Sequence, residues 1–350
     1  MTSSLQLRSL TVAATGALVL SLSACNSDVS QVYSSSTAPS QKTGPLRVAL
    51  LASSSQNGFN KAVYDGAVAR AKEYGDVEVT VFDGKFDSQT QFNQVQNVAG
   101  QGTYDGIVLV PNDNVGIAAA IPAAARAKVP VVTTLFPVGP KLTELTPQVD
   151  GIVSTVAANT EENSKKLAEG VVKYCEDKDP CRVAILIGQL QFPFDNLRNK
   201  AYRSVLDGHA NIKVVATGQG NYDRDTSLKA TQNILQANPK LDVLLSNADQ
   251  QTIGAQVALE SAGVDLSEMY VTGGGGNQEA IKQVRAGKWA ADQVDFPNSM
   301  GRAALEQVVN AVRGRQVTPV IDANTLGPVP VIVTKEVLGE HPDFKGEWAD

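Results

Sequence analysis

The stretch Leu46–Gly75, LRVALLASSSQNGFNKAVYDGAVARAKEYG, decides the fold. Its almost unbroken apolar run, Leu46–Ala52, is typical of a strand buried on both faces of a parallel sheet. Beyond the small polar residues 53–57, apolar side chains recur at helical spacing: Val63, Ala67, Ala71 and Tyr74. Gly75 follows as a helix C-terminal cap. The stretch therefore predicts the first βα unit of a doubly wound α/β domain.

The loop of this unit is a candidate binding loop. It carries two amides and an aromatic ring, at Asn57, Asn60 and Phe59. Open α/β sheets bind ligands beyond the carboxyl ends of their strands. We therefore expect the corresponding loops of later βα units to reach the same region.

The rest of the chain repeats the βα rhythm. Further strands are expected at residues 77–83, 106–110, 129–134, 152–157, 182–188, 212–217, 243–247, 269–272, 290–296 and 328–334. The stretch 135–150 contains three prolines and is interpreted as a crossover to a second lobe. We expect lobe one at 46–134 plus 295–329, and lobe two at 135–294 plus 330–350.

The first residues resemble an export signal. A basic residue, Arg8, precedes the apolar run 10–22, which is short for a membrane span. Leu22-Ser23-Ala24-Cys25 resembles the lipobox of bacterial lipoproteins; the alternative is an ordinary signal peptide followed by a chance cysteine. We expect a signal peptide at 1–24, lipid on Cys25, and a Ser/Thr-rich disordered tether at 25–45. The protein would then work outside the cytoplasm, anchored to the cell membrane in the periplasm or on the outer face.

Composition excludes several functions. The net charge of −6 and the lack of basic clusters argue against nucleic acid as a partner. Only two histidines are present, which leaves little basis for histidine catalysis or a multi-histidine metal site. We expect no metal, no cofactor and a monomer. Cys175 and Cys181, a separate pair in an exported chain, form a candidate disulfide.

Four segments carry a family resemblance: QNGFNKAVYDGAVARAKEYG at 56–75, GIVLVPND at 106–113, NYDRDTSLKATQNIL at 221–235 and LLSNADQQTIGA at 244–255. With these segments in order, residues 46–335 resemble bacterial type I solute-binding proteins, in the ribose-binding-like group that feeds sugar ABC transporters. The resemblance implies two doubly wound parallel-sheet lobes, joined by a three-segment hinge that closes on a ligand.

The resemblance also implies ligand-binding residues on loops of both lobes: Asn57, Phe59, Asn60, Asp113, Asn114, Phe194, Asn196, Arg198, Tyr222, Asn247, Asp249 and Asp295. The rings of Phe59 and Tyr222 would cover the C–H faces of a sugar. Asp113 or Asn114 would hold hydroxyl groups.

Each of these roles has a structural alternative. Phe59 could pack in the core, and Tyr222 could be an exposed loop residue. Asp113 and Asn114 both suit a helix N-cap. Arg198 could be structural, and Asp295 could be a hinge residue.

Gly273–Gly276 departs from the family pattern, which commonly has an aromatic residue and an Asp there. Four glycines could leave space for a bulkier ligand or present backbone N–H groups. A dinucleotide motif is excluded because position 278 is Gln where a glycine is required. We therefore expect a sugar other than ribose, a polyol or a related solute.

The expected function is capture of this solute and its delivery to an ABC transporter permease. A sensory binding protein that presents its ligand to a membrane receptor would have the same sequence features. An extracytoplasmic enzyme is poorly supported, because the chain lacks a Gly-x-Ser-x-Gly elbow, a Walker loop and a His-Glu-x-x-His motif.

Overall fold

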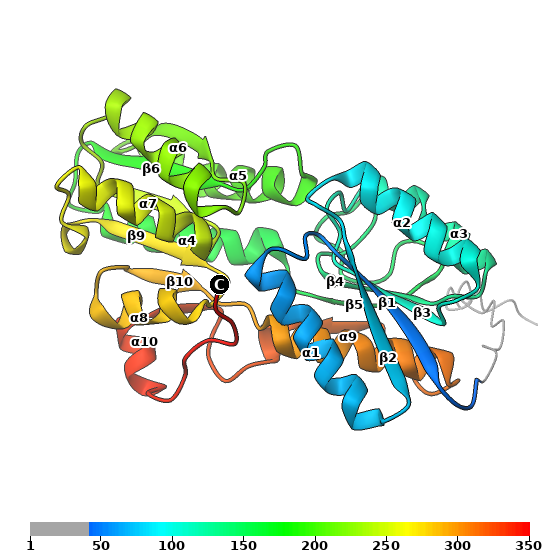
Figure 1. The fold of residues 1–350 in the computed structure, drawn as a ribbon. Coiled ribbons are helices and arrows are strands. Elements are labelled where there is room, and N and C mark those ends of the chain that lie inside the picture. The colour runs from blue at the N-terminus through cyan, green and yellow to red at the C-terminus, as the bar shows by residue number, and fades with distance from the viewer. Residues whose placement is uncertain (1–41) are drawn as a thin grey trace, which may run out of the picture. The chain divides into compact units, whose positions relative to one another are not determined.

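The computed structural model describes residues 42–350. The expected signal peptide, the lipidation site Cys25 and most of the expected tether lie outside the described residues. Within residues 42–350 the chain forms two α/β lobes, each built on a six-stranded sheet (Figure 1). The expected doubly wound, two-lobe fold is confirmed. No helix in this described part is both long and apolar enough to span a membrane.

The first sheet is entirely parallel, with strand order β11-β5-β4-β3-β1-β2. Its strands are β1 (Leu46–Ala52), β2 (Val77–Asp83), β3 (Gly106–Leu109), β4 (Val131–Leu135), β5 (Ile152–Ala157) and β11 (Val320–Asp322). One face is covered by α1 (Gly58–Tyr74) and α9 (Pro297–Val312). The other face is covered by α2 (Ser88–Gln101), the short 3-10 helix η1 (Gly116–Ala119) and α3 (Ile121–Arg126).

Strand β1 shows why its sequence is apolar throughout. Val48 and Leu50 belong to the core beneath α1 and α9, whereas Ala49 and Leu51 belong to the core beneath α2 and α3. Successive side chains of a strand point to opposite faces, so a strand covered on both faces needs apolar residues at every position.

The second sheet has the order β12-β10-β9-β8-β6-β7. Its strands are β6 (Cys181–Ile187), β7 (Ile212–Gln219), β8 (Val243–Ser246), β9 (Tyr270–Gly274), β10 (Ala291–Gln293) and β12 (Ile332–Thr334). Only β12 runs antiparallel to its described neighbour. One face packs on α4 (Thr160–Tyr174) and α5 (Pro193–Leu206), and the other on α6 (Arg224–Ala237), α7 (Asp249–Ser261), α8 (Gln278–Ala286) and α10 (Lys335–Glu340).

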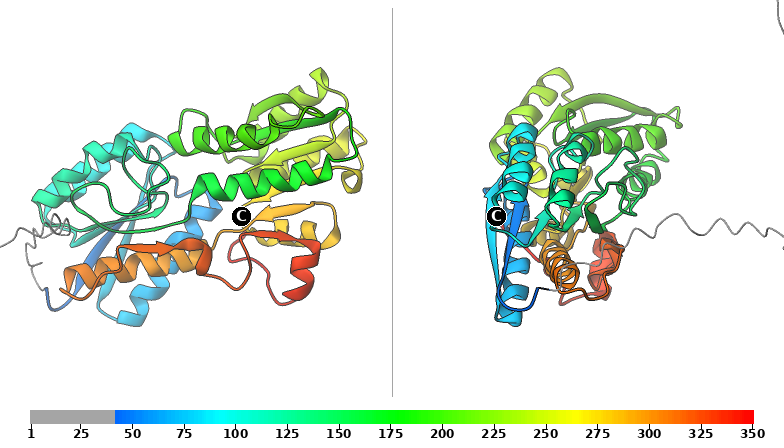
Figure 2. Two further views of the ribbon diagram at one scale, coloured as in Figure 1. Left: turned by 180° about the vertical axis from the view of Figure 1, so that it is seen from behind. Right: turned by 90° about the vertical axis from the view of Figure 1, so that its right-hand side faces the viewer.

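The chain passes between the sheets three times: after β5, after β10 and after β11. Figure 2 shows α9, in orange, beside the blue elements of the first lobe, although it follows the second lobe's strands in sequence. The first passage differs from the expected crossover at 135–150. Strand β5 pairs with β4 and β11 in the first sheet, so residues 136–151 are an excursion within lobe one.

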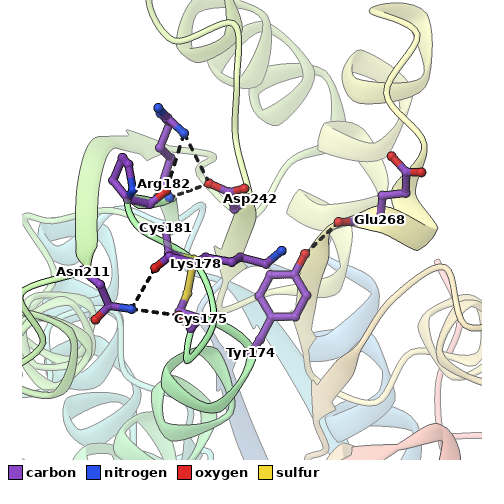
Figure 3. Close-up of a disulfide and its surroundings, with 9 residues drawn as sticks. Tyr174, Cys175, Lys178, Cys181, Arg182, Asn211, Asp242 and Glu268 are labelled. Carbon is purple, nitrogen blue, oxygen red and sulfur yellow. Dashed lines mark hydrogen bonds and ion pairs between the residues drawn. A yellow bond between two sulfur atoms is a disulfide. The ribbon is translucent and has the colours of Figure 1, made fainter.

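A disulfide joins Cys175 to Cys181, tying the end of α4 to the start of β6 (Figure 3). Both cysteines are fully buried. The turn between them is fixed by Asn211, whose Nδ2 donates to the carbonyl oxygens of Cys175 (2.8 Å) and Lys178 (3.0 Å). The bridge therefore closes a short loop that is largely exposed, between two buried cysteines.

Replacing both cysteines with serine should lower the free energy of unfolding by about 2 kcal/mol, because the unfolded chain loses the constraint of a closed loop. Urea denaturation of the parent and of the Cys175→Ser/Cys181→Ser variant measures the difference. Reductant is the control: it should destabilise the parent and leave the variant unchanged. Alkylation of both thiols in the unreduced parent would contradict the disulfide.

Candidate functional site

A cleft lies where loops at the carboxyl ends of the two sheets meet. Its lining comes from both lobes and one connection between them: Ser53, Asn57, Phe59, Asn60, Phe86, Leu135, Phe136, Phe194, Arg198, Tyr222, Asn247, Ala248, Gln250, Gly274 and Asp295. The cavity volume is ≈ 60 Å³, small beside the about 300–1,000 Å³ of pockets that hold drug-sized ligands. The lobes are therefore closely shut, and a solute of several carbon atoms enters only as they or their side chains move apart.

Eight of the twelve expected ligand-binding residues line this cleft: Asn57, Phe59, Asn60, Phe194, Arg198, Tyr222, Asn247 and Asp295. The other four lie outside the lining: Asp113, Asn114, Asn196 and Asp249. Phe59 lines the cleft and also packs against the core of the first lobe.

Aromatic rings from the two lobes stack on each other across the cleft. Phe136, after β4, lies on Phe194 of α5 with ring centroids 3.9 Å apart and planes 11° apart. Phe86, after β2, stacks on Tyr222, after β7, at 5.7 Å and 21°. Phe86 and Phe136 were not among the residues expected to bind ligand. Their position just beyond a predicted strand is the signal that could have found them.

Three cleft residues have backbone conformations that are unusual for side chains other than glycine. The φ angles are 73° at Leu135, 51° at Phe86 and 57° at Tyr222. Such conformations cost on the order of 1–3 kcal/mol each and persist only where the surroundings enforce them. The two stacked rings Phe86 and Tyr222 are therefore presented by strained backbone in both lobes.

A buried polar network forms one wall of the cleft. The Asp195 carboxylate, fully buried, accepts from the Tyr222 hydroxyl (2.6 Å), from Arg198 Nη1 (3.1 Å) and from the backbone N–H of Gln189 (2.7 Å). Asn247 Nδ2 lies 3.4 Å from Asp195 Oδ1, the oxygen that Tyr222 and Arg198 also contact. The network thus fixes the guanidinium, the phenol and an amide at the cleft surface.

Burial dominates the electrostatics of this network. It raises the pKa of Asp195, which the charge of Arg198 opposes, and it raises the pKa of Tyr222 well above its ordinary value, with Asp195 adding to the effect. Burial by itself would lower the pKa of Arg198, but Tyr222 and Asp195 raise it overall. Arg198 therefore stays charged and Tyr222 stays a hydroxyl over the physiological range.

The first loop holds its own amides. Asn57 Oδ1 accepts from the backbone N–H of Asn60 (3.2 Å) as the N-cap of α1, and Asn60 Oδ1 accepts from the N–H of Ser53 (3.1 Å). Both acceptors are thus engaged within the loop. Phe59 follows directly in the first turn of α1, so the cap also sets the position of its ring.

The four expected residues outside the lining have structural contacts. Asp113 Oδ1 accepts from the N–H groups of Val115 (3.0 Å) and Gly116 (2.7 Å), which matches the turn-capping alternative. Asn114 is buried, and its Nδ2 donates to the carbonyl oxygen of Pro137 (3.0 Å). Asn196 lies in the first turn of α5, where its N–H donates to the carbonyl oxygen of Phe192 (3.0 Å).

Asp249 belongs to a cluster of carboxyl groups behind the cleft. It accepts from the N–H groups of Gly274 (2.8 Å) and Asn277 (2.7 Å). Neighbouring Asp292 is fully buried, and neither of its carboxyl oxygens has a hydrogen-bond partner within the described residues. Residues 42–350 contain no group of three or more His, Cys, Asp or Glu side chains placed to hold a metal ion.

Burial raises the pKa values of the carboxyl groups in this cluster. It raises the pKa of Asp249 to about 7, and it raises that of Asp292 well above the ordinary value, with repulsion from Asp249 adding to the effect. At the cleft surface, burial raises the pKa of Asp295 to about 6 against the opposing charge of Arg198. Protonated carboxyls are hydrogen-bond donors as well as acceptors.

Other protein atoms occupy the space beside Gly273–Gly276. A Cβ at Gly273 would lie 2.6 Å from the Trp289 ring, and one at Gly275 would lie 3.0 Å from the Trp348 ring. The N–H groups of Gly274 and Gly275 donate to Asp249 and to the carbonyl oxygen of Gln293. Of these four glycines Gly274 lines the cleft, whereas the space beside Gly273 and Gly275 is occupied by tryptophan rings, and the N–H groups of Gly274 and Gly275 are engaged within the protein.

Comparisons with known proteins agree with this architecture. The ribose import binding protein of Bacillus subtilis is 26% identical, covering 86% of this chain and 92% of its own. The D-apiose import binding protein of Paraburkholderia graminis is 28% identical, covering 66% and 70%. The crystal structure of a Caulobacter myo-inositol binding protein bound to myo-inositol matches with a TM-score of 0.73 at 25% identity, covering 84% and 95%.

The family model described as a periplasmic binding protein domain matches residues 48–316, which is more than half of the chain. The match includes both sheets except for the short strands β11 and β12. Its description fits an extracytoplasmic location. By this match and by its fold of two parallel-sheet lobes, the chain belongs to the periplasmic binding protein domain family.

Proposed function

We propose that the protein captures a sugar or a sugar-like polyol between its lobes and delivers it to the permease of an ABC transporter. The observation that carries the proposal is the cleft itself, where stacked aromatic rings and a fixed polar network from both lobes face one small space. The similar import proteins named for ribose and D-apiose, and the structure holding myo-inositol, support this class of ligand.

The cleft offers both kinds of contact that a sugar needs. Aromatic rings such as Phe59 and Tyr222 can cover its apolar C–H faces. Arg198 can donate to hydroxyl oxygens, and Asp295 can donate or accept according to its protonation. Arg198 also lies over the ring of Phe136, at 5.1 Å from its centroid, so the charge and the apolar wall form one surface.

Ligand capture would be coupled to closure of the lobes. A solute that contacts Phe59 on one lobe and Tyr222 on the other binds the closed arrangement better than an open one, and this differential affinity drives the equilibrium. A permease that recognises the closed arrangement would then accept loaded protein. This role is binding and delivery, with no catalytic step assigned to any residue.

We also propose that the protein is a monomer held outside the cytoplasm by lipid on Cys25. The support is the apolar run 10–22 followed by Leu22-Ser23-Ala24-Cys25. Buried acyl chains contribute about 0.8 kcal/mol per CH₂ group to membrane binding, so more than one chain holds a protein stably. The expected tether, 25–45, would then join the lipid to lobe one, although Lys42 near its end already pairs with Asp105 (2.6 Å).

Removing an aromatic wall should weaken ligand binding. Phe59→Ala and Tyr222→Ala should each raise Kd roughly five- to 150-fold, because each removes apolar contact worth on the order of 1–3 kcal/mol. A thermal-shift screen of D-ribose, D-allose, D-apiose and myo-inositol selects the ligand, and isothermal calorimetry measures Kd.

The matched control is Asp113→Ala, outside the cleft. It should cost on the order of 1 kcal/mol of stability by loss of a capping contact and leave Kd within about twofold. If both aromatic variants kept the parent's Kd, the ligand would have to bind elsewhere. A large effect of Asp113→Ala on Kd would place that carboxylate in the site.

Asp295 should make stability depend on pH. Its folded pKa of about 6 lies above the unfolded value of about 3.9, so its contribution is full below about pH 4 and is lost as the pH rises through about 6. Asp295→Asn cannot ionise and escapes this loss. Urea denaturation from pH 4 to pH 8 should therefore show the variant gaining stability relative to the parent. A constant difference across this range would contradict the shift.

Lipidation can be tested by phase partitioning of membranes from cells that express the full chain. The parent should enter the detergent phase, and Cys25→Ser should move to the aqueous phase, because it lacks the thiol that receives the lipid. Cys175→Ser/Cys181→Ser is the control and should partition as the parent does. Equal recovery of the parent and Cys25→Ser in the aqueous phase would exclude the anchor.

A further inference from the structure

Residues 341–350 form a strap that is anchored on the second lobe. Arg285 of α8 donates to the carbonyl oxygens of His341 (2.8 Å) and Phe344 (2.7 Å). The backbone N–H of Gln278 donates to the carbonyl oxygen of Trp348 (2.9 Å). In Figure 1 this red segment leads from α10 to the point marked C, beside the start of α1. The strap thus ends beside the start of α1, where Gln250 of the cleft lining donates to the Asp350 carboxylate (3.4 Å).

At its far end the strap contacts the first lobe. The Glu347 carboxylate accepts from both the backbone N–H (3.0 Å) and the hydroxyl of Ser299, in the first turn of α9. The Trp348 ring meets the Phe59 ring edge to face, with centroids 5.7 Å apart and planes at 81°. These contacts join two elements of lobe one to a segment held by lobe two.

Asp350 extends the same bridge. Its carboxylate pairs with Arg224 of α6 (2.8 Å) and lies against Gly58, where an added Cβ would sit 2.5 Å from Asp350 Oδ1. Gly58 precedes Phe59 at the start of α1. The strap therefore reaches from the second lobe to the first turn of α1, which carries the Phe59 ring.

Two residues of Gly273–Gly276 contact this strap directly. Trp348 is 3% exposed, and its Nε1 donates to the carbonyl oxygen of Gly275 (2.6 Å). A Cβ at Gly346 would lie 2.1 Å from the carbonyl oxygen of Gly276. A side chain at Gly275 or Gly346 would push the strap away from the second lobe, so glycine at these two positions allows Trp348 to pack there.

We infer that Trp348 is a positioning residue for ligand capture, acting through Phe59. The inference rests on the proposed function and deepens it. Phe59 lines the cleft, and Trp348, which is not among the lining residues, packs against its ring. Trp348 thus limits the movement of a ring that the ligand would contact.

The strap also favours the closed arrangement. Separation of the lobes would break the Glu347–Ser299 hydrogen bonds and the Trp348–Phe59 ring contact, since each joins one lobe to the other. Contacts that exist only in the closed arrangement shift the equilibrium toward it. The strap therefore raises affinity without touching the ligand.

A double-mutant cycle on Kd tests the inference, with the tightest binder among D-ribose, D-allose, D-apiose and myo-inositol as the probe. Trp348→Ala should raise Kd about two- to twelve-fold, the fold-change of one aromatic pair. In a Phe59→Ala background the same change should alter Kd by less than about twofold, because its target is gone. Trp348→Phe keeps a ring and should restore most of the affinity.

The chain offers a closely matched control. Phe82 and Tyr104 form a similar edge-to-face pair within the first lobe, at 5.6 Å and 78°, outside the cleft lining. Tyr104→Ala should lower the thermal stability and leave Kd within about twofold. An unchanged Kd in Trp348→Ala, or effects of Trp348→Ala and Phe59→Ala that simply multiply, would overturn the inference.

Hydrogen exchange gives a readout that needs no ligand. The N–H groups of Asn60 and Lys61 bond to Asn57 at the start of α1, and Trp348→Ala should speed their exchange, whereas Tyr104→Ala should not. If none of the four probes bound the parent, the sugar-binding proposal would fail while this measurement still judged the strap. Unchanged exchange in Trp348→Ala would overturn the positioning role.

Discussion

Burial of parallel strands on both faces is the constraint on which the molecule depends. Strand β1 contributes Val48 and Leu50 to one core and Ala49 and Leu51 to the other, so helices must cover both sides of the sheet. Polar and strained residues are then confined to loops at the strand ends. In each lobe these loops follow the carboxyl ends of the strands, and the loops of the two lobes meet in one cleft.

The sequence was sufficient for the βα units and for the two-lobe fold class, because this constraint is periodic and local. Continuous apolar runs, helical spacing and terminal glycines identified the βα units one by one. The lobe to which β5 belongs could not be predicted. Strand β5 pairs with β4 and with β11, and β11 lies more than 160 residues later, so this pairing leaves no local signal in the sequence. The proline-containing stretch 135–150 was interpreted as a crossover to the second lobe, whereas residues 136–151 are an excursion within lobe one.

For the site, position after a strand was informative and residue chemistry was less so. Phe59 and Tyr222 were found because an aromatic ring follows a strand in a recognisable segment. Asp113 follows a strand equally well, yet its carboxylate is engaged by the N–H groups of its own turn. Trp348 lies in the strap far along the chain, and only tertiary structure brings it to Phe59.

The charge balance of the cleft argues for a neutral ligand. Arg198 is paired with Asp195, so its charge is largely matched before any solute enters. Asp295, with a pKa raised by burial to about 6, adds negative charge to the cleft lining toward neutral pH. An anionic solute would meet the Asp295 carboxylate, and a cationic one would meet the Arg198 guanidinium. A neutral polyhydroxylated solute can use both as hydrogen-bond partners without an uncompensated buried charge.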